Sequence, residues 1–119
     1  MYSIKVEEYF SSAHNLRGYK GKCEELHGHN WKIEVCIRSR KTDKIGMVED
    51  FSCVKSSLRR VLEALDHKYL NSLPYFKKIN PTSENIAKYI FNKLSPEFSK
   101  ISSVTVWESH NSSATYSKE

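Results

Sequence analysis

The chain has 119 residues, of which 39% are hydrophobic and 28% are charged, and its formal net charge is +5. This length predicts one domain, residues 1–119, with a core of ordinary size, and leaves no room for a second domain. The charged first residues and the lack of any apolar run near the ~20 residues of a membrane-spanning helix exclude a signal peptide and a membrane span, so we expect a cytoplasmic protein with no membrane partner.

Two stretches in the first third of the chain show the alternation of a half-buried strand. In residues 2–10, Tyr2, Ile4 and Val6 alternate with polar residues. Residues 31–38 alternate more cleanly, and their apolar positions are Trp31, Ile33, Val35 and Ile37. Because side chains two apart on a strand share a face, each stretch predicts a strand with one buried side.

Two helices are predicted in the middle of the chain. Asp50 is the expected N-cap of a helix that runs to about Leu65. The apolar residues of this helix recur at three- and four-residue spacing: Phe51, Val54, Leu58, Val61, Leu62 and Leu65. Thr82 is the expected N-cap of a second helix, which has Glu84 in its first turn and is ended by Pro96.

The last quarter of the chain predicts a third strand over residues 104–108, a turn over 109–113 and a short fourth strand over 114–117. The order strand, strand, helix, helix, strand, strand is typical of an α+β fold in which two helices cover one four-stranded antiparallel sheet. Such a small sheet has two free edges, and oligomerisation would cover them.

A pair of alternate histidines, His27 and His29, directly precedes the second predicted strand. If the strand extends back through the pair, both imidazoles project from one face and make half of a zinc site. His14, His67 or His110 could complete the site. We favour His14, because it follows the first strand, which would pair with the strand that carries the other two.

Cys23 decides what kind of metal site this would be. Three histidine ligands leave a coordination position open for catalysis, whereas Cys23 as a fourth ligand would close the site and make it structural. If Cys23 stays free, a nearby zinc ion favours its thiolate, which can act as a base or nucleophile. Because the cysteines form no Cys-x-x-Cys pair, they predict neither disulfides nor a Cys-rich zinc module, and Cys36 and Cys53 are expected to be packing residues.

Two further sites carry groups that could move protons or bind a ligand. Asp66 next to His67 at the end of the first predicted helix could orient the imidazole for proton transfer, provided that the helix has ended there. The alternative is that His67 is a favourable cation at a helix C-terminus. Glu108 has the parity of Val104 and Val106, so it should face the apolar side and needs either a Lys or Arg partner or a ligand there.

The positive charges are scattered along the chain rather than gathered in a block. A nucleic-acid partner would more often require a basic stripe with interleaved aromatic residues, so we expect none. A solvated basic surface explains most of the excess charge. A sharper interpretation is that the charge steers a small polyanion such as a triphosphate.

Six motifs in this order match one known family. They are Phe10-Ser11-Ser12-Ala13-His14, Cys23-x-x-x-His27-Gly28-His29-Asn30, Gly46-Met47-Val48-x-Asp50-Phe51, Leu65-Asp66-His67-x-Tyr69-Leu70-Asn71, Asn80-Pro81-Thr82-Ser83-Glu84-Asn85 and Val106-Trp107-Glu108. On these residues, which span nearly the whole chain, it resembles the 6-pyruvoyltetrahydropterin synthase family. Within that family it is most similar to the bacterial 6-carboxytetrahydropterin synthase branch of queuosine biosynthesis.

The resemblance implies a tunnelling fold, in which four-stranded antiparallel sheets with two helices on one face join as trimers into a barrel and stack as a homo-hexamer. It implies Zn²⁺ held by His14, His27 and His29. It further implies Cys23 as the proton acceptor, Asp66 with His67 as a relay and Glu108 as the pterin anchor, in active sites between subunits. The implied substrate is 7,8-dihydroneopterin triphosphate, which is converted to 6-carboxytetrahydropterin, triphosphate and acetaldehyde.

Glu24 leaves the product open. A variant branch of the family uses a glutamate three residues before the His-Gly-His and forms 6-hydroxymethyl-dihydropterin for folate synthesis, and this chain has both Cys23 and Glu24. The alternatives are therefore a 6-pyruvoyltetrahydropterin synthase-type or folate-branch enzyme, in which Glu24 is an additional acid or base. From another class, a structural-zinc binding module without catalysis is also compatible with the histidine pattern.

Overall fold

The structure, a computed structural model, describes residues 1–19 and 25–118. Its strands are β1 (Tyr2–His14), β2 (His27–Ser39), β3 (Ile101–Ser109) and β4 (Ser112–Ser117). Its α-helices are α1 (Phe51–Glu63) and α2 (Ser83–Leu94), and the short 3₁₀ turns η2 (Leu70–Ser72) and η3 (Pro74–Phe76) lie between them. None of the helices in the described ranges is long and apolar enough to span a membrane.

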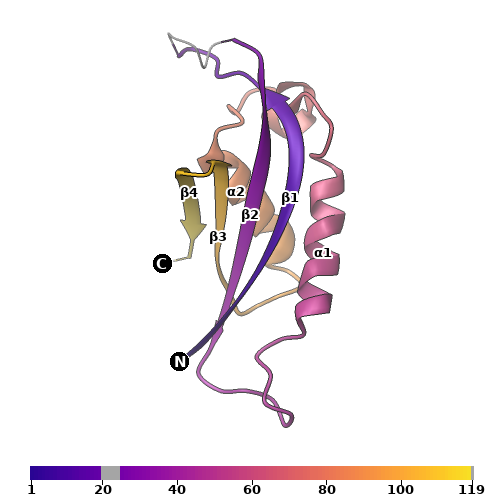
Figure 1. The fold of residues 1–119 in the computed structure, drawn as a ribbon, viewed down its shortest axis with the longest axis vertical. Helices are drawn as coiled ribbons and strands as arrows, with labels where there is room; N and C mark the ends of the chain where they lie inside the picture. The colour runs from indigo at the N-terminus through magenta and orange to yellow at the C-terminus, as the bar shows by residue number, and fades with distance from the viewer. Residues whose placement is uncertain (20–24, 119) are drawn as a thin grey trace.

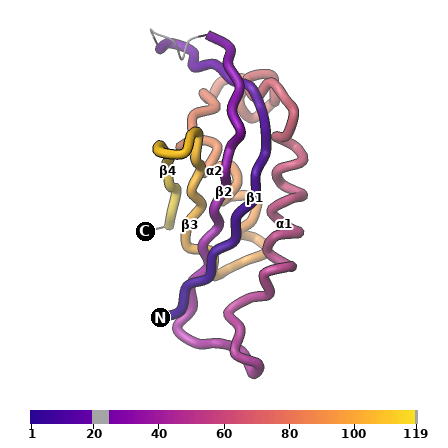
Figure 2. The backbone as a smooth tube through the Cα atoms, in the orientation of Figure 1, coloured from indigo at the N-terminus to yellow at the C-terminus, as the bar shows by residue number. Residues whose placement is uncertain are grey.

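The four strands form one antiparallel sheet in the order β1-β2-β3-β4, with the two helices on one face (Figure 1). Helix α1 packs against β1, and α2 packs against β3 and β4. Figure 2 shows β1 and β2 as the longest pair, which projects beyond the helices at one end. The predicted α+β architecture is confirmed.

The core lies between the sheet and the helices. Every second residue of β2 from Trp31 to Ile37 is buried, as the alternation predicts, and the Trp31 ring stacks on Phe10 of β1 with ring centroids 5.8 Å apart. Both predicted N-caps are confirmed, because the Asp50 side chain accepts a hydrogen bond from the Ser52 N–H and the Thr82 side chain accepts one from the Asn85 N–H.

The strands are longer than predicted. The first was expected to end at Phe10 but continues to His14, and the second begins at His27, because backbone pairing carries the ladder through polar residues that alternation cannot detect. The expected turn over residues 109–113 is narrower, since β3 reaches Ser109 and β4 starts at Ser112.

The first helix is shorter than predicted, and one of its residues lies differently. It ends at Glu63 rather than near Leu65. Cys53, which was expected to pack in the core, is exposed, because the inward face of α1 is formed by Val54 and Leu58.

Candidate metal centre and active site

Three histidines and a glutamate converge where β1 and β2 form their last pair. His14 lies directly opposite His27 in the ladder, and His29 follows two residues later on the same face of β2. Glu108 joins them from β3, and one ligand atom from each of the four residues lies within 4.8 Å of the others. A sheet brings them together because alternate residues share a face and neighbouring strands are close.

In the two facing imidazoles of His14 and His27, each Nδ1 makes a hydrogen bond to a backbone carbonyl. Nδ1 of His14 lies 2.7 Å from the Pro81 carbonyl oxygen, and Nδ1 of His27 lies 2.7 Å from the Glu25 carbonyl oxygen. A carbonyl only accepts hydrogen bonds, so each Nδ1 carries a proton. In the neutral rings the two Nε2 atoms, 3.0 Å apart, then face each other with their lone pairs.

A cation between the two Nε2 atoms removes this repulsion. A proton shared between the two Nε2 atoms would also remove the repulsion. Burial, however, lowers the pKa of His14, chiefly by desolvation, and so disfavours protonation. Neutral imidazoles with fixed tautomers are the form in which histidine binds metals, and hydrogen bonds from Nδ1 to carbonyl groups are the usual support for metal-bound rings. The arrangement fits a metal ion.

His29 supplies a third ring nitrogen to the same space. Its Nε2 is buried and makes no hydrogen bond within the described residues. It lies 3.2 Å from Oε1 of Glu108, without the alignment of a hydrogen bond. Burial also lowers the pKa of His29, and the nearby Glu108 carboxylate opposes that effect. A buried ring nitrogen that makes no hydrogen bond is well suited to coordinate a metal.

The parity argument for Glu108 is confirmed, since the side chain faces the same side of the sheet as Val104 and Val106 and meets His29 there. Among the described residues its charged neighbour is this histidine rather than a Lys or Arg. The carboxylate is about one-third exposed. It is therefore close enough to the metal centre to touch a bound ligand and open enough to be reached by one.

Asp66 and His67 lie beyond the end of α1, as proton transfer between them requires. The backbone leaves the helix at Glu63, and His67 adopts a positive φ of 54°. Oδ1 of Asp66 accepts a hydrogen bond of 2.9 Å from the Ser11 N–H, and Oδ2 lies 3.0 Å from Nδ1 of His67. The Ser11 N–H, and then His67, hold the pKa of the Asp66 carboxyl below its usual value.

Asp66 and His67 lie near the cluster formed by His14, His27, His29 and Glu108 but are not part of it. A cavity of about 470 Å³ is lined by His29 and His67, together with Lys68 and the ends of β1 and β2. The ring of His67 is 83% exposed. Asp66 and His67 are not among the four residues whose ligand atoms gather around the metal position.

Cys23 and Glu24 lie outside the described residues, so their predicted roles stay predictions. The two cysteines that the structure describes are free thiols, and neither is among the residues whose ligand atoms gather around the three histidines. Cys36 is half-buried on the sheet, and Cys53 is exposed on α1.

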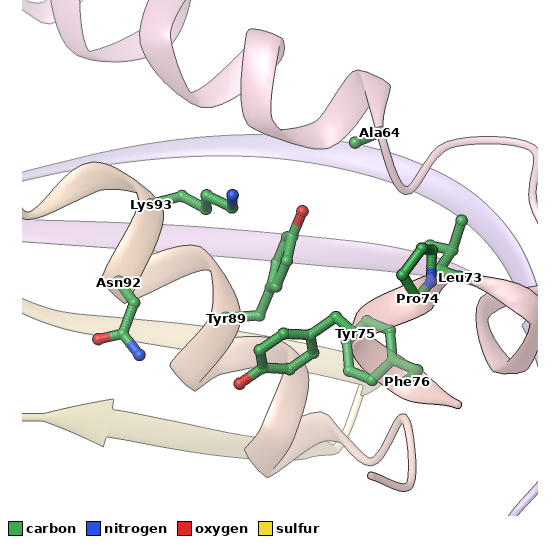
Figure 3. A pocket seen from close by; sticks show the side chains of 8 residues that line it. All are labelled: Ala64, Leu73, Pro74, Tyr75, Phe76, Tyr89, Asn92 and Lys93. Atoms are coloured by element: carbon green, nitrogen blue, oxygen red, sulfur yellow. The ribbon is translucent and has the colours of Figure 1, made fainter. Parts of the chain in front are cut away.

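The largest of the described cavities lies elsewhere, on the outer side of the helical layer. It measures about 660 Å³ and is lined mainly by aromatic and apolar side chains from η3 and α2 (Figure 3). Figure 3 shows the Tyr89 ring standing in this groove with its hydroxyl toward α1, and burial raises the pKa of that hydroxyl. Because none of the described residues that line it is a histidine, a cysteine or a carboxylate, their side chains offer neither metal ligands nor a general base.

A family model described as 6-pyruvoyl tetrahydropterin synthase matches residues 3–119. The chain belongs to the 6-pyruvoyl tetrahydropterin synthase family. The 6-carboxy-5,6,7,8-tetrahydropterin synthase of Haemophilus influenzae is 35% identical, over 98% of this chain and 99% of the relative. The enzyme of the same name from Synechocystis is 38% identical, over 98% and 93%. The structure of Caenorhabditis elegans 6-pyruvoyl tetrahydropterin synthase matches with a TM-score of 0.90 and 31% identity, over 99% of this chain and 96% of that chain.

This member of the 6-pyruvoyl tetrahydropterin synthase family is thus an enzyme of the lyase type, and its relatives carry names for both the 6-carboxy and the 6-pyruvoyl products. Sequence reasoning missed the backbone groups that set the site. The Pro81 carbonyl, which fixes the His14 tautomer, and the Ser11 N–H, which holds Asp66, carry no side-chain signal. Only the Asn80-Pro81-Thr82 motif hinted that the segment matters.

The lowered pKa values of His14 and His29 predict how the stability of the metal-free protein depends on pH. Because burial lowers the pKa of His14 and His29 below the usual histidine value of about 6.5, the unfolded chain binds protons more readily than the folded one. Their contribution is therefore fully present above about pH 6.5 and is lost as the pH falls below it. Thermal melts in a chelator should give a lower Tm near pH 5 than near pH 7.5, with a shallower decline for His14→Gln. Equal slopes for the two proteins would contradict the assignment.

Proposed function

We propose that this chain is a zinc-dependent 6-carboxy-5,6,7,8-tetrahydropterin synthase. It would convert 7,8-dihydroneopterin triphosphate and water to 6-carboxytetrahydropterin, triphosphate and acetaldehyde in queuosine biosynthesis. The observation that carries the proposal is the pair of facing Nε2 atoms of His14 and His27, 3.0 Å apart, with Nε2 of His29, which makes no hydrogen bond within the described residues, beside them. The names of the bacterial relatives favour the 6-carboxy product.

In this proposal His14, His27 and His29 hold the zinc ion and leave a position open for substrate. Bound zinc supplies Lewis-acid polarisation of the substrate's side-chain oxygens, which makes the neighbouring carbon-bound protons more acidic. The Cys23 thiolate accepts one of these protons.

The Asp66–His67 pair moves a second proton. Asp66 stays ionised because its pKa is lowered, and its contact with Nδ1 of His67 keeps that nitrogen protonated. Nε2 of His67 is then available to accept or return a proton at the substrate. The exposure of this ring, 83% in the single chain, leaves it free to reach a substrate at the surface.

Glu108 holds the pterin ring. A carboxylate can accept two parallel hydrogen bonds, one from the pterin amino group and one from the adjacent ring N–H, and this bidentate match fixes the orientation of the ring. Its place 3.2 Å from His29 sets the ring next to the metal position.

We further propose that the active enzyme is a homo-hexamer built from two trimers, with active sites between subunits. The support is the sheet itself, whose β4 edge has no strand beside it within the described chain. The face of the sheet away from the helices carries a ladder of ion pairs among Lys5, Glu7, Lys32 and Glu34, as a wall lining a barrel interior would. Light scattering on the purified protein tests the mass.

One incubation tests the reaction. The pure protein with zinc and 7,8-dihydroneopterin triphosphate should release triphosphate and acetaldehyde and form 6-carboxytetrahydropterin. Triphosphate without an aldehyde would indicate the 6-pyruvoyl product, and a larger aldehyde with 6-hydroxymethyl-dihydropterin would indicate the folate branch, in which Glu24 takes part. Tight zinc binding without turnover of any kind would indicate a structural-zinc module and would overturn the proposal.

A further inference from the structure

The outer edge of β1 is covered at the metal end by the segment that follows α1. The backbone groups of Ser11 pair with Asp66 and with the N–H of His67, and the Ala13 N–H donates to the Lys68 carbonyl at 3.0 Å. In a strand, the N–H and C=O of residues two apart point to the same edge. The next residues in this series are Asn15 and Arg17, which lie beyond the last pair of the β1–β2 ladder.

Two asparagine side chains continue the pairing along this edge. The Asn71 amide accepts a hydrogen bond from the Asn15 N–H at 3.0 Å and donates one to the Asn15 carbonyl at 2.8 Å. The Asn80 amide does the same with Arg17, at 2.9 Å to both its N–H and its carbonyl. A side-chain amide carries the same donor and acceptor as a peptide, so the two amides act as a substitute for a neighbouring strand.

These contacts lie on the edge of the chain that faces away from β2, just past the last β1–β2 pair at the metal position. After the pair His14–His27, the guanidinium of Arg17 also donates to the carbonyls of Asn71 in η2 and Phe76 in η3, at 3.1 and 2.7 Å. The ladder ends beside the three histidines, and residues 15–17 are held by the segment 71–80 instead.

The same segment holds the His14 ring from its other side. The Asn80 carbonyl accepts hydrogen bonds from the Thr82 N–H and from the Asn85 side chain, both at 2.9 Å, which fixes the peptides around Pro81. The Pro81 carbonyl in turn accepts from Nδ1 of His14 at 2.7 Å. Asn80 thus links the backbone of Arg17, three residues after His14, to the peptide whose carbonyl orients the His14 ring.

We propose that Asn71 and Asn80 are positioning residues of the metal centre, whose side-chain amides hold the backbone that follows His14 against the segment 71–81 and so keep that ligand in place beside His27 and His29. The inference rests on the zinc site of the proposed function. It does not depend on which pterin product is made, and it concerns the affinity and geometry of metal binding rather than a chemical step.

The test compares Asn80→Ala and Asn71→Ala with Asn92→Ala, an exposed asparagine on α2 that serves as the control. Zinc affinity is measured by competition with a chromophoric chelator, and site geometry by the visible spectrum of the Co²⁺-loaded protein. Partners that orient metal ligands are typically worth about 10–100-fold in affinity, so we expect a loss of at least about tenfold for Asn80→Ala and Asn71→Ala, with an altered Co²⁺ spectrum. The control should match the wild type.

Asn80→Ala is the decisive variant. Asn71 is 95% buried, and its replacement removes the side chain that contacts both the N–H and the carbonyl of Asn15, which can unfold the chain. A lowered Tm of metal-free Asn80→Ala, together with unchanged zinc affinity and an unchanged Co²⁺ spectrum, would show a purely structural role and overturn the inference. If the wild type binds zinc but turns over no pterin, the proposed function fails, yet weaker zinc binding by Asn80→Ala still supports the positioning role.

Discussion

Replacing Cys23 with alanine should leave zinc bound and reduce turnover of dihydroneopterin triphosphate by about 10²–10⁴-fold, the usual range for the loss of a general base. The expectation follows from the ligand set. The ring nitrogens of His14, His27 and His29 lie within 4.8 Å of one another, and three such nitrogens suffice for an open zinc site. In the proposed enzyme these three histidines hold the zinc ion and leave a position open for substrate, and the role proposed for the Cys23 thiol is that of the base.

The measurement is zinc content after dialysis, paired with kcat from triphosphate release. Cys53→Ala is the matched control, because this thiol is free and exposed on α1, and both quantities should be unchanged in that variant. Loss of zinc from Cys23→Ala would mean that the thiol is a fourth ligand and that the site is structural. A fall in turnover for Glu24→Gln as large as that for Cys23→Ala would instead assign the base to both residues.

The sheet could be predicted from the sequence wherever one face is buried. Strand β2 is predicted by its alternating apolar residues, because burial of one face imposes a period of two; these residues are Trp31, Ile33, Val35 and Ile37. The same reasoning did not predict residues 11–14 of β1, because the polar side chains of Ser11 and Ser12 interrupt the alternation. That continuation depends on partners distant in sequence, since the Ser12 hydroxyl donates to the Leu65 carbonyl and the His67 N–H donates to the Ser11 carbonyl at 2.6 Å.

The candidate site was predictable in its side chains but not in its backbone. His27 and His29 share a face by strand parity alone, and the choice of His14 required only that the first two strands pair. No periodicity indicates that the residues 66–80 would cover the edge of β1, because those contacts are made by backbone atoms and asparagine amides. For the same reason the sequence predicted two free sheet edges, whereas the metal end of the β1 edge is covered.

Glu108→Ala should weaken binding of the pterin by at least about 100-fold while zinc stays bound. Two hydrogen bonds to a charged acceptor are each worth about 1.5–3 kcal/mol, so their joint loss exceeds the roughly 2.7 kcal/mol of a 100-fold change. Glu108→Gln should lose nearly as much, because an amide presents one acceptor oxygen where the pterin needs two. Affinity for a non-reactive pterin is measured by calorimetry with the zinc-loaded protein.

Glu63→Ala removes an exposed carboxylate at the end of α1 and is the matched control, which should bind the pterin like the wild type. The competing role for Glu108 is suggested by its 3.2 Å approach to His29, which would also allow the carboxylate to act as a fourth metal ligand. In that case Glu108→Ala would lose zinc affinity and pterin affinity together. Because a carboxylate that only anchors the ring leaves the three histidines untouched, unchanged zinc affinity with lost pterin binding separates the two roles.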